Sequence, residues 1–205
     1  MSSRVYLGMQ CFWGESAFAK LIGVVGTRVG YAGGTTIAPT YKDIGDHTEV
    51  TEVTYDPAII SYSKILDYFW SHHDPTIKNK KQYKSAILWN TEEEKKKAEE
   101  SLDEHKKKYT RELDTYVVKL DKFHQAEDYH QKYWLRSRPA ILKQLNLTES
   151  EIPFSKLAAK MNAYLAGYDN FTELNDLARE FSLSEDLVKL VTEIGKNGGD
   201  PRACH

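Results

Sequence analysis

Apolar and polar positions alternate over short stretches in the first half of the chain, with glycines between them. This pattern predicts strands, because successive side chains of a strand point to opposite faces. Helical spacing of apolar residues occurs between these stretches, for example after Ser61, a residue type that favours helix starts. We predict strands at 4–8, 23–31, 49–55, 85–89 and 116–120. We predict helices at 15–22, from Ser61 to the residue before Asp74, at 91–109 and at 126–135.

The pattern changes near Asn146. From 148 to 194 the apolar residues recur only at helical spacing, at 154–165, 171–181 and 184–194. A glycine-rich stretch at 195–205 follows, and we expect this tail to be flexible. We therefore predict an α+β fold, with a mixed sheet covered by helices at 1–147, an all-helical C-terminal extension at 148–194 and the tail.

Composition narrows the classes of function. The 205 residues carry a formal net charge of -2, so nothing suggests a nucleic acid or an anionic membrane as partner. Aromatic residues make up 12% of the chain, which argues against disorder. No apolar run approaches the roughly 20 residues of a membrane span, and the first residues lack the apolar stretch of a secretory signal. We therefore expect a soluble protein of the cytoplasm.

The two cysteines, Cys11 and Cys204, are too few for a disulfide scaffold or a cysteine-rich zinc site. Cys11 lies between the first predicted strand and the first predicted helix, where the helix N-terminus lowers a thiol pKa. Phe12 and Trp13 follow it, and two aromatic rings could line a pocket for a small thioether-like group. A buried structural cysteine among core aromatics explains the same placement equally well.

Other candidate groups are weaker. Glu49 opens a predicted strand near aromatic residues, and partial burial there would raise its pKa enough for acid catalysis. By itself, such a position is more typical of an ordinary exposed glutamate. The histidines lack carboxylates or thiols at metal-ligand spacing, so we predict structural roles for them and no metal; they are His72, His73, His124 and His130. No phosphate-binding or G-x-S-x-G motif is present, and we predict no cofactor.

Taken together, several segments resemble the A-type peptide methionine sulfoxide reductases. Each segment is short, but their order and spacing from residue 4 to about 147 match the family. They are 11–14 (CFWG), 29–34 (VGYAGG), 39–41 (PTY), 47–50 (HTEV), 55–57 (YDP), 73–76 (HDPT), 82–87 (QYKSAI) and 126–131 (AEDYHQ). The resemblance implies the fold of that family and assigns 1–147 as its catalytic domain.

The resemblance also implies a mechanism. The thiolate of Cys11 would attack the sulfoxide sulfur, and Glu49 would give a proton to the departing oxygen. Tyr41 and Tyr83 match the family's tyrosines that hydrogen-bond this oxygen. Methionine would leave, and Cys11 would remain as a sulfenic acid.

By the same resemblance, Phe12 and Trp13 hold the S-methyl group of the substrate, which is the S epimer, either free or in oxidised proteins. The sulfenic acid would condense with a second thiol, and Cys204 on the glycine-rich tail is the candidate. Thioredoxin would then reduce the disulfide. Cys204 could instead be a surface thiol without a role.

This chain departs from the family pattern in three places. Gln10 stands where the family usually has glycine. The loop at 77–81 is short and basic, and it lacks the aspartate that helps the family bind substrate, so a preference for acidic sequence around the substrate is a hypothesis. The region 148–194 lies outside the family core; it could hold the tail near the active site, dock a reductant or enlarge the fold.

A second class of function is a redox-sensing or binding module. In that interpretation a disulfide between Cys11 and Cys204 reports oxidation, and the pocket binds methionine-containing peptides without turnover. Turnover beyond one equivalent of methionine would distinguish the enzyme from such a module. A purely structural α+β domain would leave the ordered set of motifs unexplained.

Overall fold

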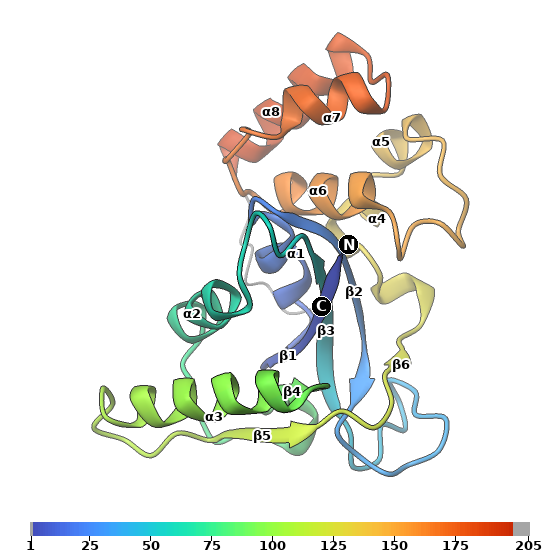
Figure 1. Ribbon diagram of the computed structural model, residues 1–205. Coiled ribbons are helices and arrows are strands. Elements are labelled where there is room, and N and C mark those ends of the chain that lie inside the picture. Colours follow the sequence, from blue (N-terminus) through green and yellow to red (C-terminus); the bar gives the residue numbers. More distant parts are fainter. Residues whose placement is uncertain (1, 199–205) are drawn as a thin grey trace.

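A computed structural model describes residues 2–198, and in this part of the chain six strands form one mixed sheet in the order β5-β4-β1-β3-β2-β6 (Figure 1). β4 and β5 pair in parallel, and the other neighbouring strands are antiparallel. The strands are β1 (Ser3–Met9), β2 (Val24–Ala32), β3 (Thr48–Tyr55), β4 (Ser85–Trp89), β5 (Thr115–Lys119) and β6 (His124–Gln125). The predicted α+β class is confirmed.

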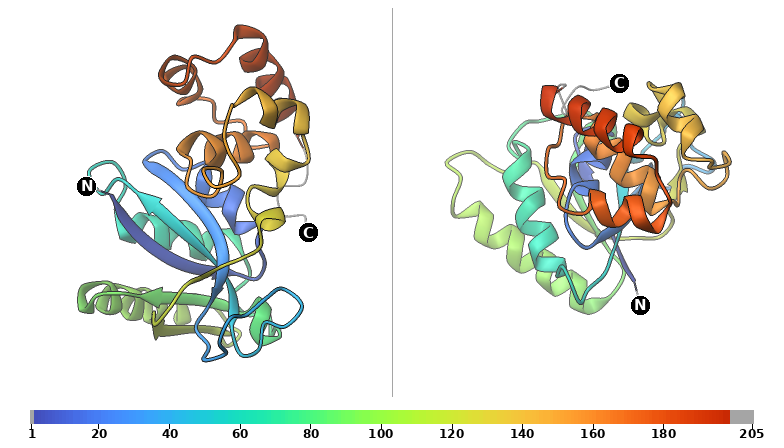
Figure 2. Two further views of the ribbon diagram at one scale, coloured as in Figure 1. Left: turned by 90° about the vertical axis from the view of Figure 1, so that its right-hand side faces the viewer. Right: turned by 90° about the horizontal axis from the view of Figure 1, so that it is seen from above.

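The helices divide into two groups. α1–α3 lie beside the sheet, and the helices after β6 gather at one end of it (Figures 1 and 2). They are α1 (Gly14–Ala19), α2 (Tyr62–His72), α3 (Glu92–Lys106), α4 (Tyr133–Arg136), α5 (Pro139–Gln144), α6 (Lys156–Leu165), α7 (Leu174–Glu180) and α8 (Glu185–Asn197), with 3₁₀ turns η1 (Lys81–Tyr83) and η2 (Asp128–His130). Four helices begin where a hydroxyl accepts a backbone N–H of the first turn, as the sequence pattern indicates. These capping residues are Ser61, Thr91, Ser155 and Ser184.

The sheet buries different side chains on its two faces. Val5, Leu7 and Met9 of β1 contribute to the core beneath α1–α3, whereas Tyr6 belongs to a second cluster on the other face. In that second cluster Phe123, from the segment between β5 and β6, packs against the sheet. Both faces are therefore covered, which explains why β3 is buried almost throughout rather than alternating.

The predicted helix at 126–135 is wrong. This segment forms η2 and the short α4, because polar groups between them bind other elements. The side-chain amide of Gln131 accepts from the backbone N–H of Val29 at 3.0 Å and donates to the Val29 carbonyl at 2.8 Å. Lys132 has a φ of 55° and donates its backbone N–H to Glu15 at 2.7 Å. A continuous helix would need a right-handed φ at Lys132 and would direct its backbone N–H into the helix's own ladder.

The C-terminal helices share one apolar core. It includes Leu135 of α4 and Ile141 of α5 together with residues of α6–α8. α4 and α5 precede the predicted boundary at 147, yet they pack with the helices that follow it; the domain boundary itself stays a prediction. α8 continues to Asn197, so the first three residues of the predicted tail are helical.

Candidate active site

Cys11 lies where β1 ends and α1 has not yet begun. Cys11 is 6% exposed, and it packs with Trp13 into the core beneath α1–α3. β1 runs beside β3 there: a Cβ on Gly8 would lie 3.2 Å from the carbonyl oxygen of Glu49. The sequence thus brings the cysteine to the end of β3 at which Glu49 stands.

Gln10 precedes the cysteine with a φ of 69°, a left-handed conformation that costs a side-chain-bearing residue about 1–2 kcal/mol. This conformation gives a physical reason for the glycine that the family has here. The side-chain amide of Gln10 donates to the carbonyl oxygen of Asp74 at 2.7 Å. It therefore links the backbone at Cys11 to the loop that leads into η1.

Glu49 is the buried carboxyl of the site. It is 1% exposed, and burial raises its pKa from 4.5 to about 7, a rise that the hydrogen bond from Gln82 partly opposes. The amide of Gln82 donates to Glu49 Oε1 at 2.8 Å. Glu49 Oε2 is buried and has no hydrogen-bond partner among the described residues. One oxygen is thus fixed and the other is left for a further ligand.

Tyr83 lies within the electrostatic influence of this carboxyl, and Tyr41, from a separate segment, interacts with Tyr83. Tyr83 ends η1, which is held beside β3 by a 2.7 Å hydrogen bond from the Thr48 hydroxyl to the Lys81 carbonyl. The side chains of Tyr83 and Tyr41 interact, and the charge of Glu49 acts on the Tyr83 hydroxyl. Burial, above all, raises the pKa of Tyr83 to about 12, so the hydroxyl keeps its proton and remains a donor at neutral pH.

An aromatic cluster connects Tyr41 to the residues that follow the cysteine. The ring of His130 lies 5.0 Å from that of Phe12 in an edge contact and 4.5 Å from that of Tyr41. Phe12 is 4% exposed, and Tyr31 packs on it with ring centroids 6.0 Å apart. Trp13 is buried as well, but in the core cluster of Cys11. The two predicted substrate-binding aromatics therefore belong to different clusters, and Cys11 shares that of Trp13.

Three further residues of the site were missed in the sequence. Gln82 was noted only as part of a motif, although its place beside Tyr83 could have marked it. The carboxylate of Glu127 accepts hydrogen bonds from the Tyr31 hydroxyl at 2.6 Å and from the Tyr41 backbone N–H at 2.9 Å. It therefore holds the backbone at Tyr41 against β2. His130 was given a structural role; its Nε2 is buried without a partner among the described residues. The mistaken helix at 126–135 concealed the positions of the last two.

Gln82→Leu is expected to move the ionisation of Glu49 to higher pH. The amide donates to the carboxylate, which favours the charged form, so its loss leaves burial unopposed and raises the pKa above about 7. A pH titration of the Glu49 carboxyl measures this, as a midpoint displaced upward. Gln82→Glu is expected to act in the same direction, because a second carboxyl there raises the pKa through repulsion. An unmoved midpoint in both variants would show that Gln82 does not influence the ionisation of Glu49.

Within residues 2–198 no three His, Cys, Asp or Glu residues gather closely enough to hold a metal ion. No helix of this part of the chain has the length and apolarity required to cross a bilayer. Cys204 lies outside the described residues. The shortened loop carries Lys78, which is exposed, just before η1.

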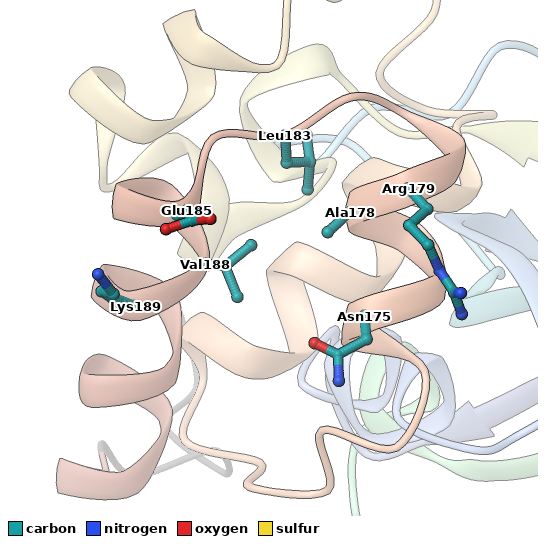
Figure 3. A pocket seen from close by; sticks show the side chains of 7 residues that line it. All are labelled: Asn175, Ala178, Arg179, Leu183, Glu185, Val188 and Lys189. Carbon is teal, nitrogen blue, oxygen red and sulfur yellow. The ribbon is translucent and has the colours of Figure 1, made fainter.

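A pocket of about 570 Å³ lies elsewhere, between α7 and α8 (Figure 3). Figure 3 shows small apolar side chains between polar ones at the rim; the lining residues are Asn175, Ala178, Arg179, Leu183, Glu185, Val188 and Lys189. None of the predicted site residues lines it. Its rim holds no buried acid or nucleophile, unlike the region of Glu49 and Cys11.

Comparison with known proteins gives a consistent result. The family model described as peptide methionine sulfoxide reductase matches residues 3–161. A peptide methionine sulfoxide reductase of Drosophila melanogaster is 41% identical over 181 residues, which cover 86% of this chain and 74% of that protein. Methionine sulfoxide reductase A of Corynebacterium diphtheriae superposes with a TM-score of 0.61 at 32% identity, covering 67% of this chain and 76% of the other.

A further solved structure is that of Mxr1 from Saccharomyces cerevisiae in complex with Trx2. It superposes with a TM-score of 0.50 at 25% identity and covers 63% of this chain and 84% of the other. The family match extends into α6, which lies beyond the predicted boundary at 147.

Proposed function

Because the chain belongs to the peptide methionine sulfoxide reductase family and is therefore an enzyme that reduces methionine sulfoxide, we propose that it acts on the S epimer with Cys11 as its nucleophile. The substrate would be methionine sulfoxide, either free or within oxidised proteins. Cys11 lies beside both the aromatic cluster of Phe12 and the strand end that carries Glu49, which suits this role.

In the first step the Cys11 thiolate attacks the sulfoxide sulfur while Glu49 protonates the oxygen. The sulfur of the substrate is reduced from sulfoxide to thioether, and its oxygen ends on Cys11 as a sulfenic acid. The hydroxyls of Tyr41 and Tyr83 hydrogen-bond the oxygen as its negative charge grows. Phe12 and Trp13 would enclose the S-methyl group.

The observation that carries this proposal is the state of Glu49. A carboxyl with a pKa of about 7 is about half protonated at neutral pH, which suits an acid catalyst. Its Oε1 accepts from Gln82, whereas the buried Oε2 has no partner among the described residues and could give its proton to a bound oxygen. The Tyr83 hydroxyl, on which the charge of Glu49 acts, and the Tyr41 side chain that interacts with it would supply further donors.

The second part of the cycle removes the sulfenic acid. We propose that the Cys204 thiol condenses with it, forming a disulfide with Cys11 and releasing water. Thioredoxin then reduces the disulfide by dithiol exchange and is itself oxidised. The complex of a related yeast protein with Trx2 supports this choice of reductant. A need for thioredoxin also favours the cytoplasm as the site of action.

The helical region from 148 to 194 would support the catalytic domain.

A single-turnover experiment tests the proposal. Pre-reduced protein without added reductant is mixed with each epimer of N-acetyl-methionine sulfoxide, and the methionine derivative formed per chain is counted. We expect about one equivalent from the S epimer alone and the loss of two thiols. Absence of product from either epimer, with folded and reduced protein, would contradict the proposal and favour a sensor or binding module.

A further inference from the structure

The position of Cys11 depends on the short helix that follows it. All six residues of α1 are buried. The backbone N–H of Glu15 donates to the Phe12 carbonyl at 3.0 Å, and that of Ala17 donates to the Trp13 carbonyl at 3.3 Å. A shift at the start of α1 is therefore passed directly to the residues that adjoin the cysteine.

A buried ion pair fixes this start. Lys132 has no exposed side-chain surface, and the side chain of Glu15 is 3% exposed; Nζ and Oε1 lie 2.6 Å apart. The Lys132 ammonium also donates to the carbonyl oxygens of Thr27 in β2 and Pro153 before α6, and its backbone N–H binds Glu15 Oε2. Three acceptors match the three protons of the ammonium, so α1, β2 and the segment before α6 meet at one cation.

A second buried lysine holds the other end of α1. Lys160 of α6 is 1% exposed, and its ammonium donates to the Leu21 carbonyl at 2.8 Å and to Glu173. Ala159 and Ala163 on the same helix pack against Ala19. α1 is thus held at both ends by cations from the C-terminal part of the chain, but only Lys132 acts at the end next to Cys11.

We propose that Lys132 and Glu15 form a positioning pair, which sets the geometry of Cys11 by fixing the first turn of α1. This role rests on the proposed function of Cys11 but concerns another part of the molecule. The pair acts through the backbone bond from Glu15 to Phe12 and does not touch the substrate. Because Lys132 also binds Pro153, the pair couples the active site to the segment that leads into α6.

Lys132→Met tests the pair, and Lys160→Met is its matched control at the distal end of α1. Both variants replace a buried ammonium by an apolar chain of similar length and leave a glutamate without its partner. In pre-reduced protein, with the adduct counted on the peptide that carries Cys11, we expect Lys132→Met to slow alkylation by iodoacetamide by about tenfold or more. The first turnover should slow by a similar factor, because a displacement of about 1 Å at a reacting group has effects of that size or larger. Lys160→Met should change neither rate by more than about twofold once the folded fraction is equal.

The double variant Glu15→Gln/Lys132→Met removes both charges, so it folds even where a lone buried charge would not be tolerated. It should keep the slowed alkylation, because no cation then joins α1 to Pro153. Equal rates in Lys132→Met and Lys160→Met, or ordinary alkylation in the double variant, would overturn the positioning role. Alkylation does not need the substrate, so this test is independent of whether the wild-type chain produces methionine.

Discussion

Glu49→Gln is expected to lower the rate of the first turnover by about 10² or more. Glutamine has nearly the same shape and can accept the hydrogen bond of Gln82 through its carbonyl oxygen, but it has no acidic proton to give to the sulfoxide oxygen. Rapid-quench measurement of methionine formation from the S epimer gives this rate directly. In the wild type we expect the rate to fall above about pH 7 as Glu49 ionises, and the variant should lack this limb.

Stability provides the control for this substitution. The folded chain raises the pKa of Glu49 from 4.5 to about 7, so the folded state binds the proton more tightly than the unfolded state does. The free energy of unfolding attributable to this group therefore falls as pH rises from 4.5 to 7, and the penalty is complete above pH 7. The difference in free energy of unfolding, variant minus wild type, should therefore be more favourable to Glu49→Gln at pH 8 than at pH 4. A near-normal first turnover in a folded variant would assign the acid elsewhere.

Local patterns were sufficient for most of the fold. β4 begins and ends where it was predicted, and α2 begins after the serine that caps it, because alternation and capping depend on neighbouring residues. The prediction of a helix at 126–135 was wrong for the opposite reason. The course of this segment is set by Gln131 and Lys132, whose partners Val29 and Glu15 are about a hundred residues away in the chain. Helical spacing cannot reveal such bonds.

In the candidate site, too, the residue types could be predicted from the sequence, whereas their contacts with distant residues could not. The resemblance to a family supplied Cys11 and Glu49, but it could not indicate that Gln82 holds one oxygen of the carboxyl and leaves the other without a partner among the described residues. Nor could it indicate that Gln10 adopts a left-handed backbone and binds Asp74. Both facts depend on how η1 and the loop before it fold against β1 and β3. Such long-range geometry tunes a site whose residue types the sequence already predicts.

Cys204→Ser is expected to separate the two halves of the catalytic cycle. In the proposed cycle the first turnover needs only Cys11 and a proton donor, so the variant should still produce about one methionine per chain. It should then stop with one added oxygen on Cys11, because no second thiol of the chain can form the disulfide that thioredoxin reduces. Intact-mass analysis after single turnover detects that oxygen, and thioredoxin-coupled turnover should fall to background.

The sulfenic acid itself remains reactive, and this supplies the control. A small dithiol such as dithiothreitol can attack it directly and restore cycling without Cys204, since thiol exchange depends on access of the attacking thiolate. A tail thiol has the advantage of being tethered: closing a longer loop adds only about 0.6 kcal/mol for each doubling of its length, so distance along the chain is a small obstacle. Full thioredoxin-driven turnover in Cys204→Ser would remove this cysteine from the mechanism, because thioredoxin would then have to reduce Cys11 without a disulfide of this chain.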